Sequence, residues 1–190
     1  MASRPSNRRR NFWTVDLLKI GEHDRILEIG CGPGLALASC ASRATSGVIV
    51  GLDHSQEMLQ QATRRNRRFI EGGKVRLEHG GLDRISSMPE RFDKVFAVNV
   101  VQFISDKTAV FQAILGVLVP GGVFAVTYMP RHRKPKRSDA MRMADDVAAH
   151  MSLAGFSLDR VEELPFQPAP AVCVLGCRPK GPGEQEAAIQ

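Results

Sequence analysis

Residues 27–34 read LEIGCGPG, a glycine-rich stretch that follows an apolar run typical of a buried strand. Glycine occupies every second position from Gly30 to Gly34, and an acid, Glu28, stands just before them. Such glycines let the backbone turn sharply and let a ligand lie directly against it. A second acid, Asp53, ends the next apolar run, VIVGLD. The pattern predicts a site for a nucleotide-like ligand with carboxylates beside it.

The glycine spacing argues against a dinucleotide or a phosphate as that ligand. A dinucleotide-binding turn reads G-x-G-x-x-G or G-x-G-x-x-A. Here the third glycine comes one residue early, and Leu35 stands where a small residue is needed. The lysine of a phosphate-binding P-loop is missing from this stretch, and Glu28 would repel a pyrophosphate. The residues therefore favour a ligand that carries positive charge.

Strand and helix patterns alternate around this stretch. We expect strands at 25–29, 48–53, 74–79, 92–100, 123–128, 157–164 and 171–179, with helices at 12–20, 35–43, from 55 onward, 107–118 and 138–154. Alternation of helices with apolar strands predicts a doubly wound α/β sheet with helices on both faces. In such a sheet the ligand lies beyond the carboxyl ends of the strands, where the first strand turns into its helix.

Some element boundaries and faces can also be predicted. Ser55 is placed to cap the third helix. Pro120-Gly121-Gly122 should separate the fourth helix from the strand that follows it. The first helix should turn Phe12, Val15 and either Leu18 or Ile20 toward the core.

These motifs, taken in order, resemble the class I S-adenosylmethionine-dependent methyltransferases. DRILEIGCGPG (24–34) is similar to the family's first motif, acid-x-G-x-G-x-G, and Asp53, FDKVFAVNVVQFI (92–104) and LVPGG (118–122) follow in register. Residues 138–179 match the remaining pattern. The resemblance implies a Rossmann-like, seven-stranded, mostly parallel sheet whose last strand is antiparallel and whose middle binds S-adenosylmethionine.

The resemblance also implies which residues contact the cofactor's tail and ribose. Space for these groups is left by four residues of the first motif, Gly30, Cys31, Gly32 and Gly34. Glu28 favours the ammonium of the amino-acid tail, directly or through water. Asp53 can accept hydrogen bonds from both ribose hydroxyls, or it could merely cap the turn that follows it.

The adenine end departs from the family pattern. By resemblance His54 and Met58 flank the adenine, although Met58 also fits the apolar stripe of its helix and could be a core residue. Many family members have Gly-Asp after the third strand, where the acid bonds the adenine amino group, but this chain has GGLD at 80–83. The backbone of Gly81 and Leu82 then holds the adenine, or Asp83 reaches back; we favour the backbone.

At the methyl end, Asn99 matches a position whose backbone meets the cofactor, and Val100 follows it. Methyl transfer is an in-line displacement at a carbon that the sulfonium activates, so alignment is the protein's main contribution. A general base is needed only if the acceptor must lose a proton. His132, Tyr128 and His54 are candidates, and we assign no catalytic residue. The sequence NVVQ lacks the Asn/Asp-Pro-Pro-Tyr signature of enzymes that methylate amino groups of bases and glutamine.

The net charge of +6 comes from two short segments. Residues 1–10 and RHRKPKR (131–137) hold nine of the 26 Lys and Arg residues and no acid, and RRNRR (64–68) adds a smaller group. These are either solvated segments or the rim of a site for a small anionic acceptor bearing phosphate or carboxylate. RNA would select the same charges, and a cofactor-binding protein that transfers no methyl is a third alternative.

Length and composition suit a single domain. With 190 residues, 43% hydrophobic and 24% charged, we expect an N-terminal arm and short helix at 1–24, the methyltransferase domain at 25–179 and a flexible tail at 180–190. No apolar run could span a bilayer, and the four cysteines have no zinc-like spacing, so we expect no membrane segment and no metal. An opening without a signal-peptide pattern favours the cytoplasm, with a short organellar presequence as the alternative. The sequence does not assign an oligomeric state.

Overall fold

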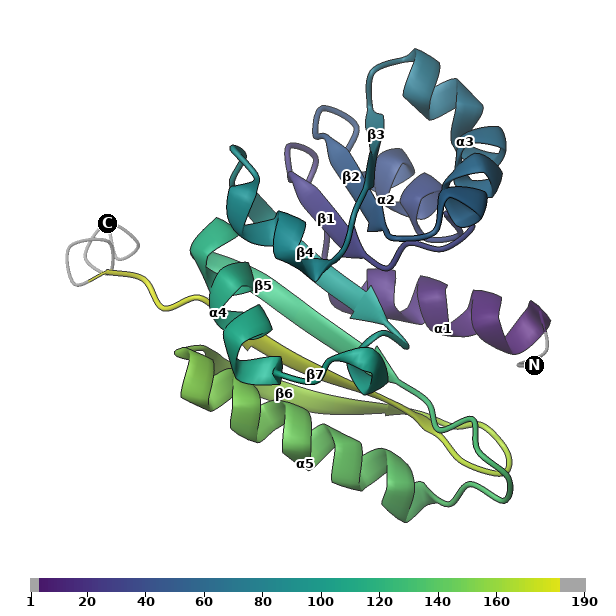
Figure 1. Ribbon diagram of the computed structural model, residues 1–190, viewed down its shortest axis with the longest axis vertical. Coiled ribbons are helices and arrows are strands. Elements are labelled where there is room, and N and C mark those ends of the chain that lie inside the picture. The colour runs from purple at the N-terminus through teal and green to yellow at the C-terminus, as the bar shows by residue number, and fades with distance from the viewer. Residues whose placement is uncertain (1–3, 182–190) are drawn as a thin grey trace.

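The computed structural model describes residues 4–181 and contains a seven-stranded sheet with strand order β3-β2-β1-β4-β5-β7-β6 (Figure 1). The strands are β1 (Ile26–Ile29), β2 (Ile49–Asp53), β3 (Val75–His79), β4 (Phe92–Val98), β5 (Leu118–Tyr128), β6 (Ser157–Leu164) and β7 (Ala171–Cys177). Strand β7 pairs antiparallel with both β5 and β6, whereas β1 to β5 pair in parallel. The predicted fold class is confirmed.

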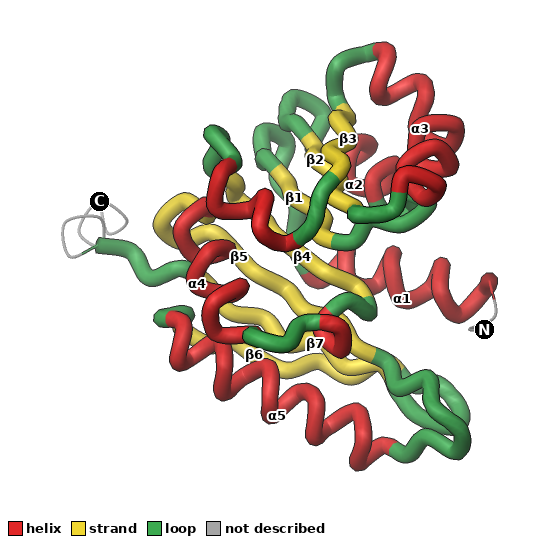
Figure 2. Tube along the Cα trace, viewed as in Figure 1, coloured by secondary structure: helices red, strands yellow, loops and turns green. Residues whose placement is uncertain are grey.

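Helices cover both faces of this sheet (Figure 2). They are α1 (Arg4–Leu17), α2 (Leu37–Arg43), α3 (Gln56–Glu71), α4 (Lys107–Val117) and α5 (Arg137–Ala154), with short 3₁₀ turns η1 (Leu82–Ser87) and η2 (Val101–Phe103). Residues of α4 and α5 pack in one buried cluster, while α1, α2 and α3 contribute to a second cluster on the other face. None of these helices is long and apolar enough to cross a membrane.

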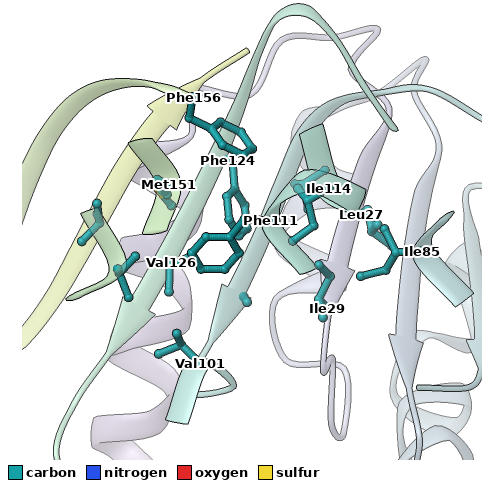
Figure 3. Packing of buried hydrophobic residues seen from close by; sticks show 14 of the residues in the cluster. Leu27, Ile29, Ile85, Val101, Phe111, Ile114, Phe124, Val126, Met151 and Phe156 are labelled. Carbon is teal, nitrogen blue, oxygen red and sulfur yellow. The ribbon is translucent and has the colours of Figure 1, made fainter. Parts of the chain in front are cut away.

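Alternate strand residues supply the two clusters, as the pleat of a strand requires. Leu27 and Ile29 of β1 belong to the cluster under α4 and α5, whereas Ile26 belongs to the cluster under α1 to α3. Three phenylalanines anchor the first cluster (Figure 3): the Phe124 ring lies 5.2 Å from Phe111 in an edge contact and 5.5 Å from Phe156. Glu28 has the parity of Ile26, so its side chain points to the α1 to α3 face.

The register of the parallel strands gathers the ligand-facing residues at one edge. Ile29 pairs with Leu52 on β2 and with Ala97 on β4. Gly30, which follows β1, and Asp53, the last residue of β2, therefore lie side by side at this edge. The carboxyl ends of β1, β2 and β4 thus form the predicted crevice.

The largest differences from the predicted element boundaries are in α1 and β5. Helix α1 begins at Arg4 and ends at Leu17, although its apolar pattern predicts 12–20. Strand β5 begins at Leu118, directly after α4, so Pro120-Gly121-Gly122 lies inside the strand. Leu118 pairs with Phe92, and the register shifts before the next pair, which identifies the Pro-Gly-Gly stretch as an irregularity in the strand instead of a loop.

Other local predictions hold. The Ser55 hydroxyl accepts a hydrogen bond from the Met58 amide, which caps α3. Val15 of α1 and Leu18, which follows the helix, are buried, and Phe12 is half-buried. The predicted tail at 180–190 lies almost entirely outside the described residues.

Candidate functional site

An apolar cavity of about 390 Å³ opens beyond the carboxyl ends of β1, β2 and β4. It is lined by Ile29, Gly30, Leu52, Asp53, His54, Gly80, Gly81, Leu82, Val98, Asn99, Val100 and Phe103. We call it the apolar cavity. Its volume and its few polar groups are those of a small-molecule site.

A smaller cavity of about 150 Å³ adjoins the first and shares Gly30, Val98 and Asn99 with it. The remaining lining is mostly polar or backbone: Asn7, Asn11, Glu28, Cys31, Gly32, Pro33, Leu35 and Arg131. We call it the polar cavity. A ligand with an apolar ring system and a short charged tail would fill both cavities and cross at the three shared residues.

The glycines of the first motif have different structural reasons. Gly30 (φ +66) could not carry a side chain, because a Cβ there would lie 2.4 Å from Cγ2 of Val100. Gly32 (φ +52) has nothing within 4 Å of that position, so its open side faces space at the polar cavity. Gly34 (φ +72) packs against α3, where a Cβ would lie 2.4 Å from Asn66 Nδ2. Gly34 lines neither cavity, and its contact with the cofactor stays a prediction.

Asp53 joins the glycine stretch to the end of β2. Its Oδ2 accepts a hydrogen bond of 2.7 Å from the Gly32 amide, and its Oδ1 accepts one of 2.9 Å from the Ser55 amide. The side chain is 7% exposed and lines the apolar cavity. Each carboxylate oxygen retains a lone pair that can accept a further hydrogen bond. Shaping the turn and accepting from a ligand are therefore compatible roles for this residue.

Glu28 is a buried acid without a counter-ion. It is 2% exposed, and its Oε2 has no hydrogen-bond partner among the described residues. Burial, and secondarily the negative charge of Asp53, raise the pKa of Glu28 well above its ordinary value. A positively charged ligand group in the polar cavity would favour the carboxylate form.

Asn99 is held rigidly where the two cavities meet. Its backbone is left-handed (φ +57), a conformation that asparagine tolerates better than most residues. The side-chain Oδ1 of Asn99 accepts a 2.8 Å hydrogen bond from the backbone N–H of Met129. The backbone N–H of Asn99 donates to the Thr127 carbonyl at 2.8 Å. Gln102 donates to its carbonyl at 2.7 Å. The shared wall is thus fixed by bonds to β5 and η2.

Of the residues predicted to lie near the adenine, some line the apolar cavity and others do not. His54, Gly81 and Leu82 line the apolar cavity, whereas Met58 and Asp83 line neither cavity. Met58 is half-buried on α3 and belongs to neither core cluster of the described residues, so its place beside the adenine stays a prediction. Gly81 and Leu82 thus lie at the cavity and Asp83 does not, and backbone recognition of an adenine there stays a prediction.

None of the three candidate bases lies at the shared wall. Tyr128 and His132 line neither cavity, and His132 Nε2 is 3.2 Å from Asp139 Oδ2. Burial and the charge of Asp139 raise the pKa of Tyr128, which makes a phenolate harder to form. His54 lines the apolar cavity, but its side chain is 87% exposed.

Sequence reasoning missed Asn7, Asn11 and Arg131, which line the polar cavity. A signal was present in the chain. Residues 7, 10, 11 and 14 follow the i, i+3, i+4, i+7 spacing of one helix face, and all four are polar. The segment 131–137 was noticed for its charge, but only Arg131 of that segment lines either cavity.

Comparison with known proteins agrees with this geometry. A family model for the methyltransferase domain matches residues 26–122. The chain is 30% identical over 173 residues to YdaC of Bacillus subtilis (strain 168), described as an uncharacterized methyltransferase, with 91% of this chain and 93% of YdaC covered. It is 35% identical over 101 residues to a trans-aconitate 2-methyltransferase of Methylobacterium radiotolerans, covering 53% of this chain and 36% of that enzyme.

Among solved structures, the N-methyltransferase NodS from Bradyrhizobium japonicum WM9 has a TM-score of 0.73 at 16% identity, covering 95% of this chain and 100% of that one. At this identity the likeness shows the fold alone. Together with the matched family model, it assigns the protein to a class of enzymes with a Rossmann-like methyltransferase fold. The chain belongs to the class I S-adenosylmethionine-dependent methyltransferase family.

Replacing Glu28 by glutamine should stabilise the protein at neutral pH. The pKa of Glu28 is higher in the folded chain than in the unfolded chain, so the unfolded chain loses this proton first as pH rises, and stability falls. We expect Glu28→Gln to raise the free energy of unfolding by roughly 1 kcal/mol or more at pH 7. The difference should vanish as the pH falls toward 4. Urea unfolding at both pH values measures it, and a variant less stable than the parent at pH 7 would contradict the charge argument.

Alanine at Gly32 and at Gly34 should affect stability differently. Both residues have positive φ, so each alanine costs about 1–2 kcal/mol of backbone strain. Only at Gly34 does the new methyl collide, with Asn66 and Ala62, which adds about 1–3 kcal/mol. Chemical unfolding of the two variants tests this order. Equal losses would show that Gly34 does not act through its packing against α3.

Proposed function

We propose that this protein binds S-adenosylmethionine across the two cavities and transfers its methyl group to a small anionic acceptor, with a carboxylate favoured. The observation that carries the proposal is the buried, unpaired Glu28 in a polar cavity that adjoins an apolar one of adenosine size. The cofactor's amino-acid tail has an ammonium group whose positive charge would pair with this acid. A pyrophosphate in the same place would be repelled.

The residues present fit the cofactor group by group. The apolar cavity would take the adenosine, with Gly81 and Leu82 offering backbone groups at the adenine and His54 at its edge. Asp53 would accept from the ribose hydroxyls while it holds the glycine stretch. The open side of Gly32 leaves room for the tail beside Glu28.

When bound, S-adenosylmethionine supplies a methyl carbon that its sulfonium activates. The chain's own contribution at that point is alignment, because Asn99 and Gly30 form a wall with little freedom to move. Glu28 and Asp53 fix the two ends of the cofactor and so set the direction in which the methyl faces. None of the candidate bases among the described residues stands at this wall.

The arrangement favours an acceptor that is already ionised. A carboxylate oxygen attacks the methyl without losing a proton, so no general base is required. The loop 131–136 follows the carboxyl end of β5, at the same end of the sheet as the two cavities (Figure 1), and the charge of its basic residues would attract an anion. A relative's name, trans-aconitate 2-methyltransferase, specifies an organic anion and supports this class of acceptor.

The cofactor assignment can be tested by calorimetry. S-adenosylmethionine and S-adenosylhomocysteine should bind, whereas NAD should not. Asp53→Ala should weaken binding by roughly 1–3 kcal/mol, because the ribose hydroxyls and the Gly32 amide lose their acceptor. Gly32→Ala should bind far more weakly than Gly34→Ala, since only the first places a methyl at the polar cavity. Tight NAD binding, or unchanged affinity in Asp53→Ala, would overturn the assignment of these roles.

The anionic acceptor can be tested on the basic loop. Two basic residues of the segment are left unchanged: Arg137 forms an ion pair with Glu163 (Nη2 to Oε2, 2.8 Å), and Arg131 lines the polar cavity. The triple variant Arg133→Gln/Lys134→Gln/Lys136→Gln therefore removes only the remaining charges of the loop. We expect unchanged affinity for S-adenosylhomocysteine. Methylation of di- and tricarboxylic acids, trans-aconitate included, should have a several-fold lower kcat/KM and a weaker salt dependence than in the parent.

The same assay distinguishes the alternatives. Methyl transfer to RNA in place of the acids, abolished by nuclease, would replace the small acceptor by a nucleic acid. Cofactor binding with no transfer to either class would favour a non-catalytic protein. An identical salt response in parent and triple variant would identify the loop as solvated and remove its support for the anion.

A further inference from the structure

The buried face of α1 is polar, and its central residue is an arginine without a counter-ion. Arg10 is 0% exposed. Its Nη1 lies 3.0 Å from Met129 Sδ, its Nη2 donates to Asn7 Oδ1 at 3.0 Å, and its Nε has no partner among the described residues. No acid forms an ion pair with it in the described part of the chain. A buried cation without an anion is costly, so this arrangement calls for a compensating charge.

Arg131 adds a second cation at the same place. It lines the polar cavity, and its charge, together with the larger effect of burial, lowers the pKa of Arg10 to about 10. Arg131 is exposed over much of its surface, and partial burial of its guanidinium lowers its pKa; no acid offsets either shift. Two neighbouring guanidinium groups thus repel one another beside the cavity that holds Glu28. The polar cavity therefore has an acid and a cation on its wall, and neither is neutralised by the other.

Asn7 connects the buried arginine to the cavity. Its Oδ1 accepts from Arg10 Nη2, and Asn11 Nδ2 approaches the same oxygen at 3.5 Å while it donates to the Asn7 carbonyl at 2.8 Å. Because both donors approach Asn7 Oδ1, the side-chain amide of Asn7 uses its oxygen for these contacts. Its Nδ2, which is a donor, can then serve a ligand in the polar cavity that Asn7 lines. Arg10 thus acts on the cavity through Asn7.

We propose that Asn7 and Arg131 bind the carboxylate of the S-adenosylmethionine tail, that Arg10 is the positioning residue for Asn7, and that Glu28 faces the ammonium. This inference rests on the proposed function. The cavity of about 150 Å³ has room for an amino-acid tail, and it contains the glycine stretch as well as Glu28. An amino acid carries both charges on one carbon, which matches an acid and a cation on one small cavity. Arginine and amide donors are suited to a carboxylate.

The experiment compares three ligands: S-adenosylmethionine, its decarboxylated form, which retains the ammonium and the sulfonium, and 5′-methylthioadenosine, which lacks the tail. The parent should bind the first more tightly than the second. Arg131→Gln should weaken S-adenosylmethionine about tenfold or more and leave the decarboxylated form within about twofold. Asn7→Ala should shift the same ratio by less. Glu28→Gln should weaken both charged-tail ligands, and no variant should alter 5′-methylthioadenosine.

Two further variants serve as controls. Arg133→Gln removes a cation from the same loop at a residue that lines neither cavity, and all three affinities should match the parent. Arg10→Met removes the buried charge at similar length. It should lower the preference for the carboxylate without lowering the melting temperature, because a purely structural residue would change stability and leave the ligand ratio alone.

The outcomes are separable. Equal weakening of S-adenosylmethionine and its decarboxylated form in Arg131→Gln, or no change in either, overturns the carboxylate assignment while cofactor binding stands. Unchanged cofactor affinity with a raised KM for an acid acceptor would assign Arg131 to the acceptor and also overturn it. A parent that binds none of the three ligands would refute the proposed function itself.

Discussion

The hydrogen bond from the Gly32 amide to Asp53 is the contact on which the site depends. It ties the turn after β1 to the end of β2, and the second oxygen of Asp53 starts the turn into α3 by accepting from Ser55. With the turn held there, Gly32 keeps its left-handed backbone and presents its open side at the polar cavity. One buried carboxylate that lines the apolar cavity therefore holds a glycine that lines the polar cavity.

The protein maintains charges around this turn that do not stabilise the fold. Glu28 is buried without a partner, and Arg10 and Arg131 are gathered without an acid. Glu28 and Arg10 are both buried, and burying an ionisable group without a partner costs stability. Met129 connects them to the rest of the site, because its sulfur contacts Arg10 and its amide donates to Asn99. Binding groups and the wall at which the two cavities meet are thus linked through the residue that follows β5.

Much of the fold could be predicted because buried strands leave a local pattern of apolar residues in the sequence. The runs that became β2 and β6 are read directly from the chain. The start of β5 could not be, since Pro120-Gly121-Gly122 is a breaker by composition and joins the strand only because β4 lies alongside to pair with it. Helix α1 was placed too late because its first turns are polar, and the apolar rule does not detect a buried polar face.

The sequence by itself determined the glycine turn, the two acids beside it and the order of strands and helices, because these depend on residue type and short spacing. Only the tertiary structure decided which glycine packs and which faces the cavity, since Gly34 meets α3 across a distance in sequence that no local pattern encodes. It also decided that Asn7 and Arg131 share a cavity. Helix α1 packs on one face of the sheet and brings Asn7 and Asn11 to the cavity that Arg131, after β5, also lines. A charge acquires its environment only when that packing is formed.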